Sequence, residues 1–289
     1  MTVTAPSSLG RAPFIFTPAW NELLPDHLSA SSLTMFARCP EQWRNRYVLG
    51  IKSRPGAALI WGGADHFAHE TNFAQKIESF TDLPLNAVQD AFRDGVRQRI
   101  EDSGGFGEIE WGRIDGAAEI IDRGVGLVAA YHNAVSPLVQ PVAVEQRFSL
   151  EYPWCPVPII GYIDLETEPR IIEGKTSGQK VSRPKPEWRL QAKLYQAARR
   201  KPVSWHLRVK TRVPAVYTAR DLPGLASEYS ETQVDLALVR VRRLVSRISE
   251  FYKRYGPDRP WPTDAPNIGW KDDFCGFCGY RPDCAWWAE

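Results

Sequence analysis

The chain has 289 residues, of which 36 are basic and 34 acidic, giving a formal net charge of +2. Hydrophobic residues make up 43% and charged residues 24%, which excludes a collagen-like, coiled-coil or wholly disordered chain. No apolar run approaches the roughly 18–20 residues that a membrane helix needs, and the N-terminus lacks the pattern of a secretory signal. We therefore expect a cytoplasmic protein without membrane contact, folded as one large domain or two small ones.

Two details of the composition bear on the ligand. Arg outnumbers Lys 26 to 10, and the chain has 11 Trp residues. The Arg guanidinium binds phosphates by bidentate hydrogen bonds, and the Trp ring stacks on unpaired bases. A GC-rich genome and tryptophans in the core would give the same counts, so the composition alone does not require a nucleic-acid ligand.

The first half of the chain is predicted to be mostly helical. Residues 1–28 are rich in Ser, Pro and Thr, which is typical of a loose lead-in. Serine N-caps then precede a short helix, which Pro40 interrupts or restarts. We expect the pair Gly62 and Gly63 to open a helix over residues 64–80. Apolar spacing predicts two further helices, over residues 84–101 and 113–134.

The second half alternates between strands and helices. Alternating apolar residues predict strands over residues 141–150, 159–165, 170–176, 203–210 and 213–218, with the second and third forming a hairpin. Helices are predicted over residues 187–200 and along an apolar stripe from Val234 to Tyr252. This order indicates an α/β fold with α+β-like character, in which helices flank a mixed central sheet. We expect a helical part over 29–135, a core over 136–256 and a cysteine-rich tail over 257–289, with 29–289 in one compact domain.

Two carboxylates and an ammonium are predicted to meet on the hairpin. Glu173 and Lys175 lie two residues apart on a strand and therefore share a face. The hairpin brings Asp164 beside Glu173. Carboxylate oxygens bind Mg²⁺, and a bound Mg²⁺ polarises a phosphoryl oxygen and lowers the pKa of its water. These are the parts that phosphodiester hydrolysis requires, although Glu173 and Lys175 alone would equally suit a surface ion pair.

Motifs around this hairpin resemble a known family. Gln191 and Tyr195, four residues apart, share one face of the helix over 187–200. Four motifs follow one another along the chain: GxxxH, G-[YR]-[IVL]-D, [DE]-x-K-[TS] and Q-x-x-x-Y. In this order they resemble the RecB-type branch of the PD-(D/E)XK nuclease superfamily. The matching segments are Gly62–His66, Gly161–Asp164, Glu173–Thr176 and Gln191–Tyr195.

The resemblance implies a restriction-endonuclease-like core and assigns roles to the motif residues. It implies a metal ion bound by His66, Asp164 and Glu173, with Lys175 as the catalytic lysine. Gln191 and Tyr195 would support the lysine or the DNA. An imidazole ligand favours Mn²⁺ over Mg²⁺.

Three nearby residues depart from this pattern or compete with it. The family usually has an apolar residue where Gly174 stands. His69, three residues after His66, is expected to support the site or the fold rather than to bind metal. Glu145 lies on the first predicted strand and could reach the site, but a direct role is not expected.

The cysteines suggest a second metal site. Cys275, Cys278 and Cys284 form a C-x2-C-x5-C pattern, and Cys39 is the candidate for a fourth thiolate. Thiolates alone suit either zinc or an iron–sulfur cluster. Cys155 is left over and is expected to be an ordinary thiol.

A further resemblance favours iron–sulfur. The first cysteine stands in a sequence context that comprises Ser29, Ser31, Leu33, Phe36 and Cys39. This context, together with the C-terminal trio, is similar to the iron–sulfur CRISPR-associated exonucleases. This similarity implies a structural [4Fe–4S] cluster on the four cysteines, with zinc as the alternative. It spans most of residues 29–289, thinly between the motifs.

These observations predict a Mg²⁺- or Mn²⁺-dependent deoxyribonuclease, expected to be an exonuclease that prefers single-stranded ends. The expected strand contacts are Arg183, Lys185, Trp188 and Arg189, although a solvated basic helix start explains them equally well. The sequence has no phosphate-loop motif and therefore no helicase signature. Unwinding of duplex DNA would thus require a helicase or recombination partner. The alternatives are a non-catalytic nucleic-acid-binding module and an iron–sulfur electron-transfer protein. Repair, recombination, phage replication and CRISPR adaptation all remain open as pathways.

Overall fold

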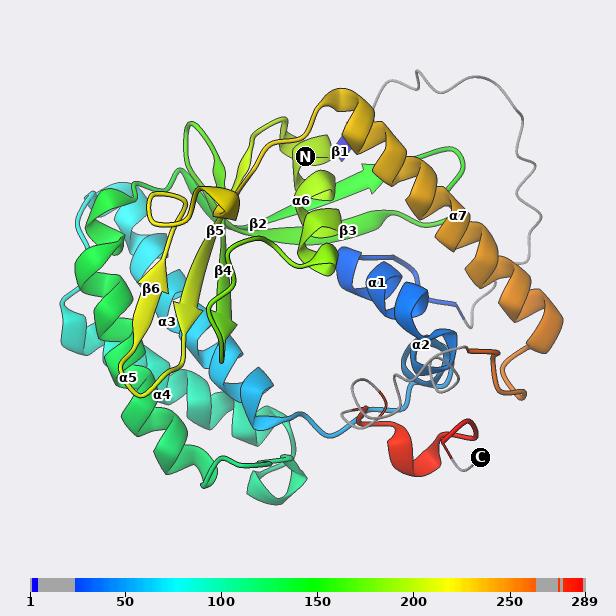
Figure 1. The fold of residues 1–289 in the computed structure, drawn as a ribbon, viewed down its shortest axis with the longest axis horizontal. Helices are drawn as coiled ribbons and strands as arrows, with labels where there is room; N and C mark the ends of the chain where they lie inside the picture. The colour runs from blue at the N-terminus through cyan, green and yellow to red at the C-terminus, as the bar shows by residue number, and fades with distance from the viewer. Residues whose placement is uncertain (1, 5–23, 264–274, 276–277, 288–289) are drawn as a thin grey trace.

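The chain forms a mixed β-sheet with helices on both faces, as predicted (Figure 1). The computed structural model describes residues 2–4, 24–263, 275 and 278–287. The helices that it describes are α1 (Ala30–Arg38), α2 (Pro40–Tyr47), α3 (Ala57–Ser79), α4 (Leu85–Asp102), α5 (Gly116–Ala134), α6 (Pro186–Arg199) and α7 (Glu231–Tyr255). The strands are β1 (Thr2–Thr4), β2 (Ala143–Glu151), β3 (Ile159–Glu166), β4 (Ile171–Ser177), β5 (Val203–Val209), β6 (Ala215–Tyr217) and β7 (Ala226–Ser227).

The sheet has the order β1-β2-β3-β4-β5-β6, and β7 pairs with β5. The strands β2, β3 and β4 form an antiparallel meander, so the predicted hairpin is confirmed. The strands β4 and β5 are parallel, and α6 makes the crossover between them. This arrangement places the motif strands at the centre of the sheet, where both faces can be covered.

Different helices cover the two faces of the sheet. Figure 1 shows α3, α4 and α5 together on one side, while α6 and α7 lie on the other beside α1. The larger core cluster fills the second side and contains the fully buried Trp43, Trp205 and Trp261. A second cluster between α3, α4 and α5 includes the buried Trp61. None of the described helices is long and apolar enough to cross a membrane.

The helix α3, which carries the histidine motif, begins earlier than predicted. It starts at Ala57, so Gly62 and Gly63 lie inside it rather than at its opening. A Cβ at Gly63 would lie 2.3 Å from the Arg99 guanidinium of α4. The glycine is therefore explained by close packing of α3 on α4, and this tertiary contact outweighs the low helix propensity of glycine.

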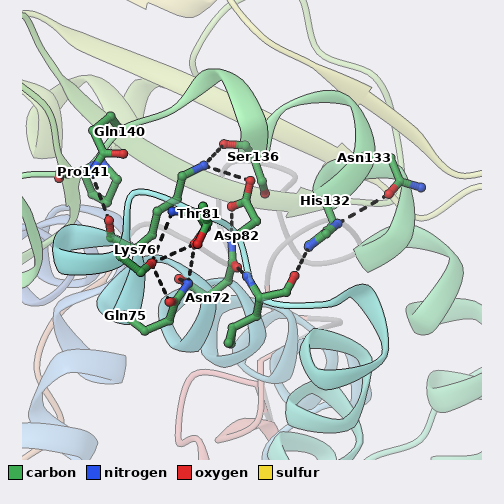
Figure 2. A network of polar contacts seen from close by, with 12 residues as sticks. Asn72, Gln75, Lys76, Thr81, Asp82, His132, Asn133, Ser136, Gln140 and Pro141 are labelled. Atoms are coloured by element: carbon green, nitrogen blue, oxygen red, sulfur yellow. Dashed lines mark hydrogen bonds and ion pairs between the residues drawn. The ribbon is translucent and has the colours of Figure 1, made fainter.

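A buried polar network fastens the C-terminal end of α3 (Figure 2). The Lys76 ammonium donates to Asp82 and to the Ser136 carbonyl, both at 2.8 Å. Asn72 donates to the other Asp82 carboxylate oxygen at 2.7 Å and accepts from the Leu83 amide at 2.8 Å. The network joins α3 to the start of α4 and to the turn after α5. It thereby fixes the helix on which the motif histidine stands.

The two ends of the chain also contact the folded part. The strand β1 pairs with β2, and Leu28 forms a bridge with Ile159, so parts of the expected lead-in belong to the sheet. At the other end, Trp261 stacks on Trp43 of α2, and its amide donates to Glu41 at 2.6 Å. The C-terminal segment therefore returns to α2 (Figure 1).

Candidate active site

The site forms where β3 and β4 separate. The two strands pair only at Leu165–Ile172 and Glu166–Ile171. Two residues beyond Ile172, the Gly174 amide donates to the Asp164 side-chain carboxylate at 2.9 Å. A side chain thus replaces the next ladder bond, and the strands open into a fork with Asp164 inside it.

Three possible metal ligands converge at this fork. His66 Nε2 lies 3.0 Å from Glu145 Oε1 and 3.6 Å from Asp164 Oδ1. One ligand atom from each residue lies within 4.8 Å of the other two, and the described residues contain no other such His, Cys, Asp or Glu group. The side chains are 31%, 31% and 19% exposed, so an ion could reach them from solvent. Imidazole and carboxylates in this combination suit Mn²⁺ or Mg²⁺.

Glu145 itself indicates that a cation belongs here. Its Oε1 atom is buried and lies 3.0 Å from His66 Nε2, but it accepts no hydrogen bond in the described structure. Its backbone has φ of 49°, a conformation that is uncommon for a residue other than glycine. The register of the flanking pairs, Val144–Leu165 and Gln146–Ile163, places Glu145 opposite Asp164. A divalent ion between the two side chains would give these buried carboxylate oxygens a positive charge to bind.

Glu173 and Lys175 form a second layer of the site together with α6. The Lys175 ammonium donates to Glu173 Oε1 at 2.7 Å and to the Gln191 amide oxygen at 3.2 Å. The Gln191 amide donates to Glu173 Oε1 at 2.9 Å and to the Tyr195 hydroxyl at 2.7 Å. The Tyr195 hydroxyl lies 2.9 Å from Glu173 Oε2 and 2.6 Å from the Tyr162 carbonyl oxygen. The predicted four-residue spacing therefore brings both α6 side chains onto Glu173.

Burial and mutual repulsion shift the pKa values of the carboxyl groups. Burial, with the charges of Asp164 and Glu70, raises the pKa of Glu145 to about 8. Burial and the Asp164 charge raise the pKa of Glu173 to about 7, against the opposing effect of Lys175. The pKa of Asp164 is also raised by its burial. The carboxyl groups of the site are therefore protonated more readily than in water, because burial and mutual repulsion disfavour their charged forms.

The neighbouring basic groups have pKa shifts that suit their expected roles. Burial alone would lower the pKa of Lys175, but the Glu173 and Asp164 carboxylates outweigh it and raise that pKa. Lys175 is therefore a cation at neutral pH. Burial, followed by the Arg208 charge, lowers the pKa of His66. The His66 imidazole is then neutral, the form that binds metal.

His69 does not join this group, in agreement with its expected supporting role. Its ring packs 4.4 Å from the Tyr131 ring, and its Nε2 lies 3.6 Å from Asp65. Burial lowers the pKa of His69 to about 4. Asp65 is itself fully buried and ion-paired with Arg208 at 2.6 Å. Burial would raise the pKa of Asp65, but Arg208 outweighs it and holds that pKa at about 2.

A groove leads to Lys175 from outside the molecule. Its walls come from α1, β3 and α6 and include Arg38, Tyr162, Trp188 and Gln191. Of the four expected DNA contacts, Trp188 lines this groove and stacks on Trp205 at 5.4 Å. Arg183, Lys185 and Arg189 are exposed at the start of α6, and the Lys185 ammonium lies 5.7 Å from the Trp188 ring.

The four cysteines expected to act together line one pocket beside α2. Cys39 is buried at the N-cap of α2, where its sulfur accepts from the Gln42 amide and from the Thr263 hydroxyl, both at 3.4 Å. The Gln42 side chain donates to the Cys278 sulfur at 3.7 Å. The pocket is also lined by Cys275, Cys284, Trp286 and Trp287. Cys155 lies elsewhere, against the main core, and burial raises its pKa to about 11, which fits an unreactive thiol.

A mixed sheet whose fork gathers acidic side chains and a lysine places the chain among α/β nucleases with a restriction-endonuclease-like fold. The chain belongs to the PD-(D/E)XK nuclease superfamily, whose family model matches residues 27–285.

One solved structure agrees with this fold, and a second was found at a lower TM-score. A "putative exonuclease" from Eubacterium rectale is 11% identical and superposes with a TM-score of 0.51, covering 89% of this chain and 91% of the other. The structure of SSO0001 is 12% identical, with a TM-score of 0.32 and coverage of 88% and 96%. No curated protein matches the sequence.

The structure gives two residues a larger part in the site than the sequence analysis expected. Glu145 was not expected to have a direct role, yet it is the residue nearest His66 in the three-ligand group. The register of β2 against β3 was the missing information, because it alone shows that Glu145 faces Asp164. Arg208 drew no attention because a single arginine on a buried strand carries no motif.

These pKa values predict that metal binding strengthens as the pH rises. Glu145 and Glu173, with pKa values of about 8 and 7, hold protons near pH 6 in the folded ion-free protein, whereas in the unfolded chain they have lost them. The free energy of unfolding without metal therefore falls as the pH rises from about 5 to 8. Because Mn²⁺ must displace the Glu145 proton, its affinity rises up to about tenfold per pH unit below pH 8.

The increase in Tm caused by Mn²⁺, measured from pH 6 to pH 8.5, should grow steadily. The variant Glu145→Gln has no proton to lose at that position and should show a flatter dependence. A Tm increase that is the same at every pH would contradict this explanation.

Proposed function

We propose that the protein is a metal-dependent deoxyribonuclease that removes nucleotides from single-stranded DNA ends. The observation that carries this proposal is the arrangement at the fork: His66, Glu145 and Asp164 converge, and Lys175 lies on the adjacent strand, bonded to Glu173. A non-catalytic binding module would not need these groups together. An electron-transfer protein would need a redox partner group, and the sequence has no flavin or nicotinamide fingerprint.

The residues divide the proposed work between them. His66, Glu145 and Asp164 would hold the divalent ion, with Glu173 as a further ligand because its carboxyl contacts that of Asp164. The bound ion would supply Lewis-acid chemistry and lower the pKa of its water. Lys175 remains protonated and stabilises the charge that develops on the phosphate. Gln191 and Tyr195 fix the orientation of Lys175 and Glu173 by hydrogen bonds.

The groove supports a single-stranded substrate. Tyr162, 53% exposed on β3, and Trp188 on α6 line the approach to Lys175. Unpaired bases stack on such rings without regard to sequence. Arg183, Lys185 and Arg189 would contact the backbone phosphates beside them. Duplex DNA would be cleaved only after another protein, such as a helicase, has exposed an end.

Cleavage assays with end-labelled single- and double-stranded DNA, in Mg²⁺ or Mn²⁺, test this function. Lys175→Ala should keep its fold by circular dichroism and its DNA affinity, but lose about 10²-fold or more in kcat. Lys253→Ala, which removes an exposed lysine of α7, is the matched control and should cleave normally. Wild-type protein that leaves every DNA form intact, or an active Lys175→Ala variant, would refute the proposal. Products longer than one to a few nucleotides would point to an endonuclease instead.

We also propose that Cys39, Cys275, Cys278 and Cys284 bind a [4Fe–4S] cluster of structural function. Four thiolates around one zinc ion would have sulfurs about 3.8 Å apart, given a Zn–S distance of about 2.3 Å. Among the described residues, no three of these sulfurs lie within 4.8 Å of one another, and a cavity separates them. This spacing favours a larger, polynuclear group. The cluster would join α2 to the C-terminal segment and thereby close a very long loop.

Purified protein should be brown, absorb near ~400 nm and contain iron. Cys39→Ser should lose the colour and lower the Tm, because the pocket then lacks its buried thiolate. Cys155→Ser, the matched control, should keep both the colour and the iron. Zinc in place of iron would reject the cluster, and protein without either metal would reject the site.

A further inference from the structure

A buried ion pair lies directly behind the proposed active site. Arg208 on β5 and Asp65 on α3 have side chains that are 5% and 0% exposed, and Arg208 Nε lies 2.6 Å from Asp65 Oδ2. Asp65 immediately precedes His66 in α3. The strand β5 is paired with β4, which carries Glu173 and Lys175. The pair therefore connects α3, which supplies His66, to the strand that is paired with β4.

The Arg208 side chain fills the space that Gly174 leaves empty. The parallel register pairs Gly174 with His206 and Thr176 with Arg208, which puts these side chains on one face of the sheet. A Cβ at Gly174 would lie 2.5 Å from Arg208 Nη2 and 3.0 Å from its Cζ. The residue at position 174 must therefore be glycine as long as the guanidinium keeps its place. An apolar side chain, usual at this position in the family, is here replaced by an arginine from the neighbouring strand.

The guanidinium is held on its other sides as well. Its Cζ lies 5.0 Å from the centre of the buried Tyr131 ring, which suits a cation–π contact. Asp65, its partner, also accepts from the Thr176 hydroxyl of β4 at 3.3 Å. Moving Arg208 would leave a fully buried carboxylate without its counter-ion, which is strongly unfavourable. The contact therefore fixes α3 against both β4 and β5.

We propose that Arg208 is a positioning residue that sets the distance of His66 from the carboxylates of the fork. It does so through its ion pair with Asp65 and its close packing on Gly174. This inference rests on the proposed function of that site. Arg208 touches neither the substrate nor the ion in this account. It acts by holding the backbone of α3 at His66 and the backbone of β4 at Gly174, whose amide in turn holds Asp164. Groups that orient metal ligands in this way change metal affinity or activity by about 10–100-fold.

Removing both charges together is the first test. The variant Asp65→Asn/Arg208→Met leaves no unpaired charge buried, so it should fold, as judged by circular dichroism and a cooperative thermal transition. Its affinity for Mn²⁺, measured by electron paramagnetic resonance of the free ion, should fall about 10–100-fold. On single-stranded DNA, kcat should fall while KM changes little, because the groove is untouched.

The glycine provides a second test by a double-mutant cycle. Gly174→Ala in the otherwise wild-type chain should displace Arg208 and weaken Mn²⁺ binding about 10-fold or more. In the Asp65→Asn/Arg208→Met background the same change should cost less than about twofold, because no ion pair remains to be displaced. Gly178→Ala, one residue beyond β4 and with no atom within 4 Å of the new methyl group, is the matched control and should have no effect.

The outcomes separate this inference from the function itself. Equal losses from Gly174→Ala in both backgrounds, or a folded Asp65→Asn/Arg208→Met variant with wild-type Mn²⁺ affinity and kcat, would overturn the role of Arg208. Wild-type protein that binds Mn²⁺ but cleaves no DNA would reject the nuclease proposal, while the Mn²⁺ measurements would still decide the role of Arg208.

Discussion

The structure depends on one hydrogen bond, from the Gly174 amide to the Asp164 carboxylate. By taking the place of a main-chain ladder bond, it ends the pairing of β3 with β4 while both strands continue. The opening exposes the edges of two central strands to side chains from α3 and α6. Carboxylates concentrate there, and burial together with their mutual repulsion raises the pKa values of Glu145 and Glu173. A bound divalent cation would offset this repulsion and favour the charged carboxylates.

Helices from both faces of the sheet complete the site. On one face, α6 supplies Gln191 and Tyr195, which bond to Glu173. On the other, α3 supplies His66, and the network around Lys76 fastens the end of that helix (Figure 2). The site is therefore built on rigid elements rather than on loops, as positioning of metal ligands requires. The cysteine pocket serves a separate need, since it connects α2 with the C-terminal segment.

Much of this arrangement followed from local sequence patterns. The hairpin, the α6 crossover helix and the placing of Gln191 beside Tyr195 depend on periods of two and of three to four residues, which the sequence displays directly. Glu145 could not be recognised in this way, because its role depends on the register between β2 and β3. The start of α3 was misplaced because Gly62 and Gly63 have low helix propensity, whereas Gly63 packs closely on Arg99 of α4 inside the helix. Gly174 likewise departed from the family pattern for a reason that lies on another strand, at Arg208.

The central claim is that His66, Glu145 and Asp164 bind one divalent ion. Its most direct test is an anomalous difference map, recorded at the manganese edge, from a crystal grown with Mn²⁺. We predict a peak in direct contact with His66 Nε2 and with carboxylate oxygens of Glu145 and Asp164. A map whose manganese peaks all lie on other residues, or one with no peak at the fork at saturating Mn²⁺, would contradict this account.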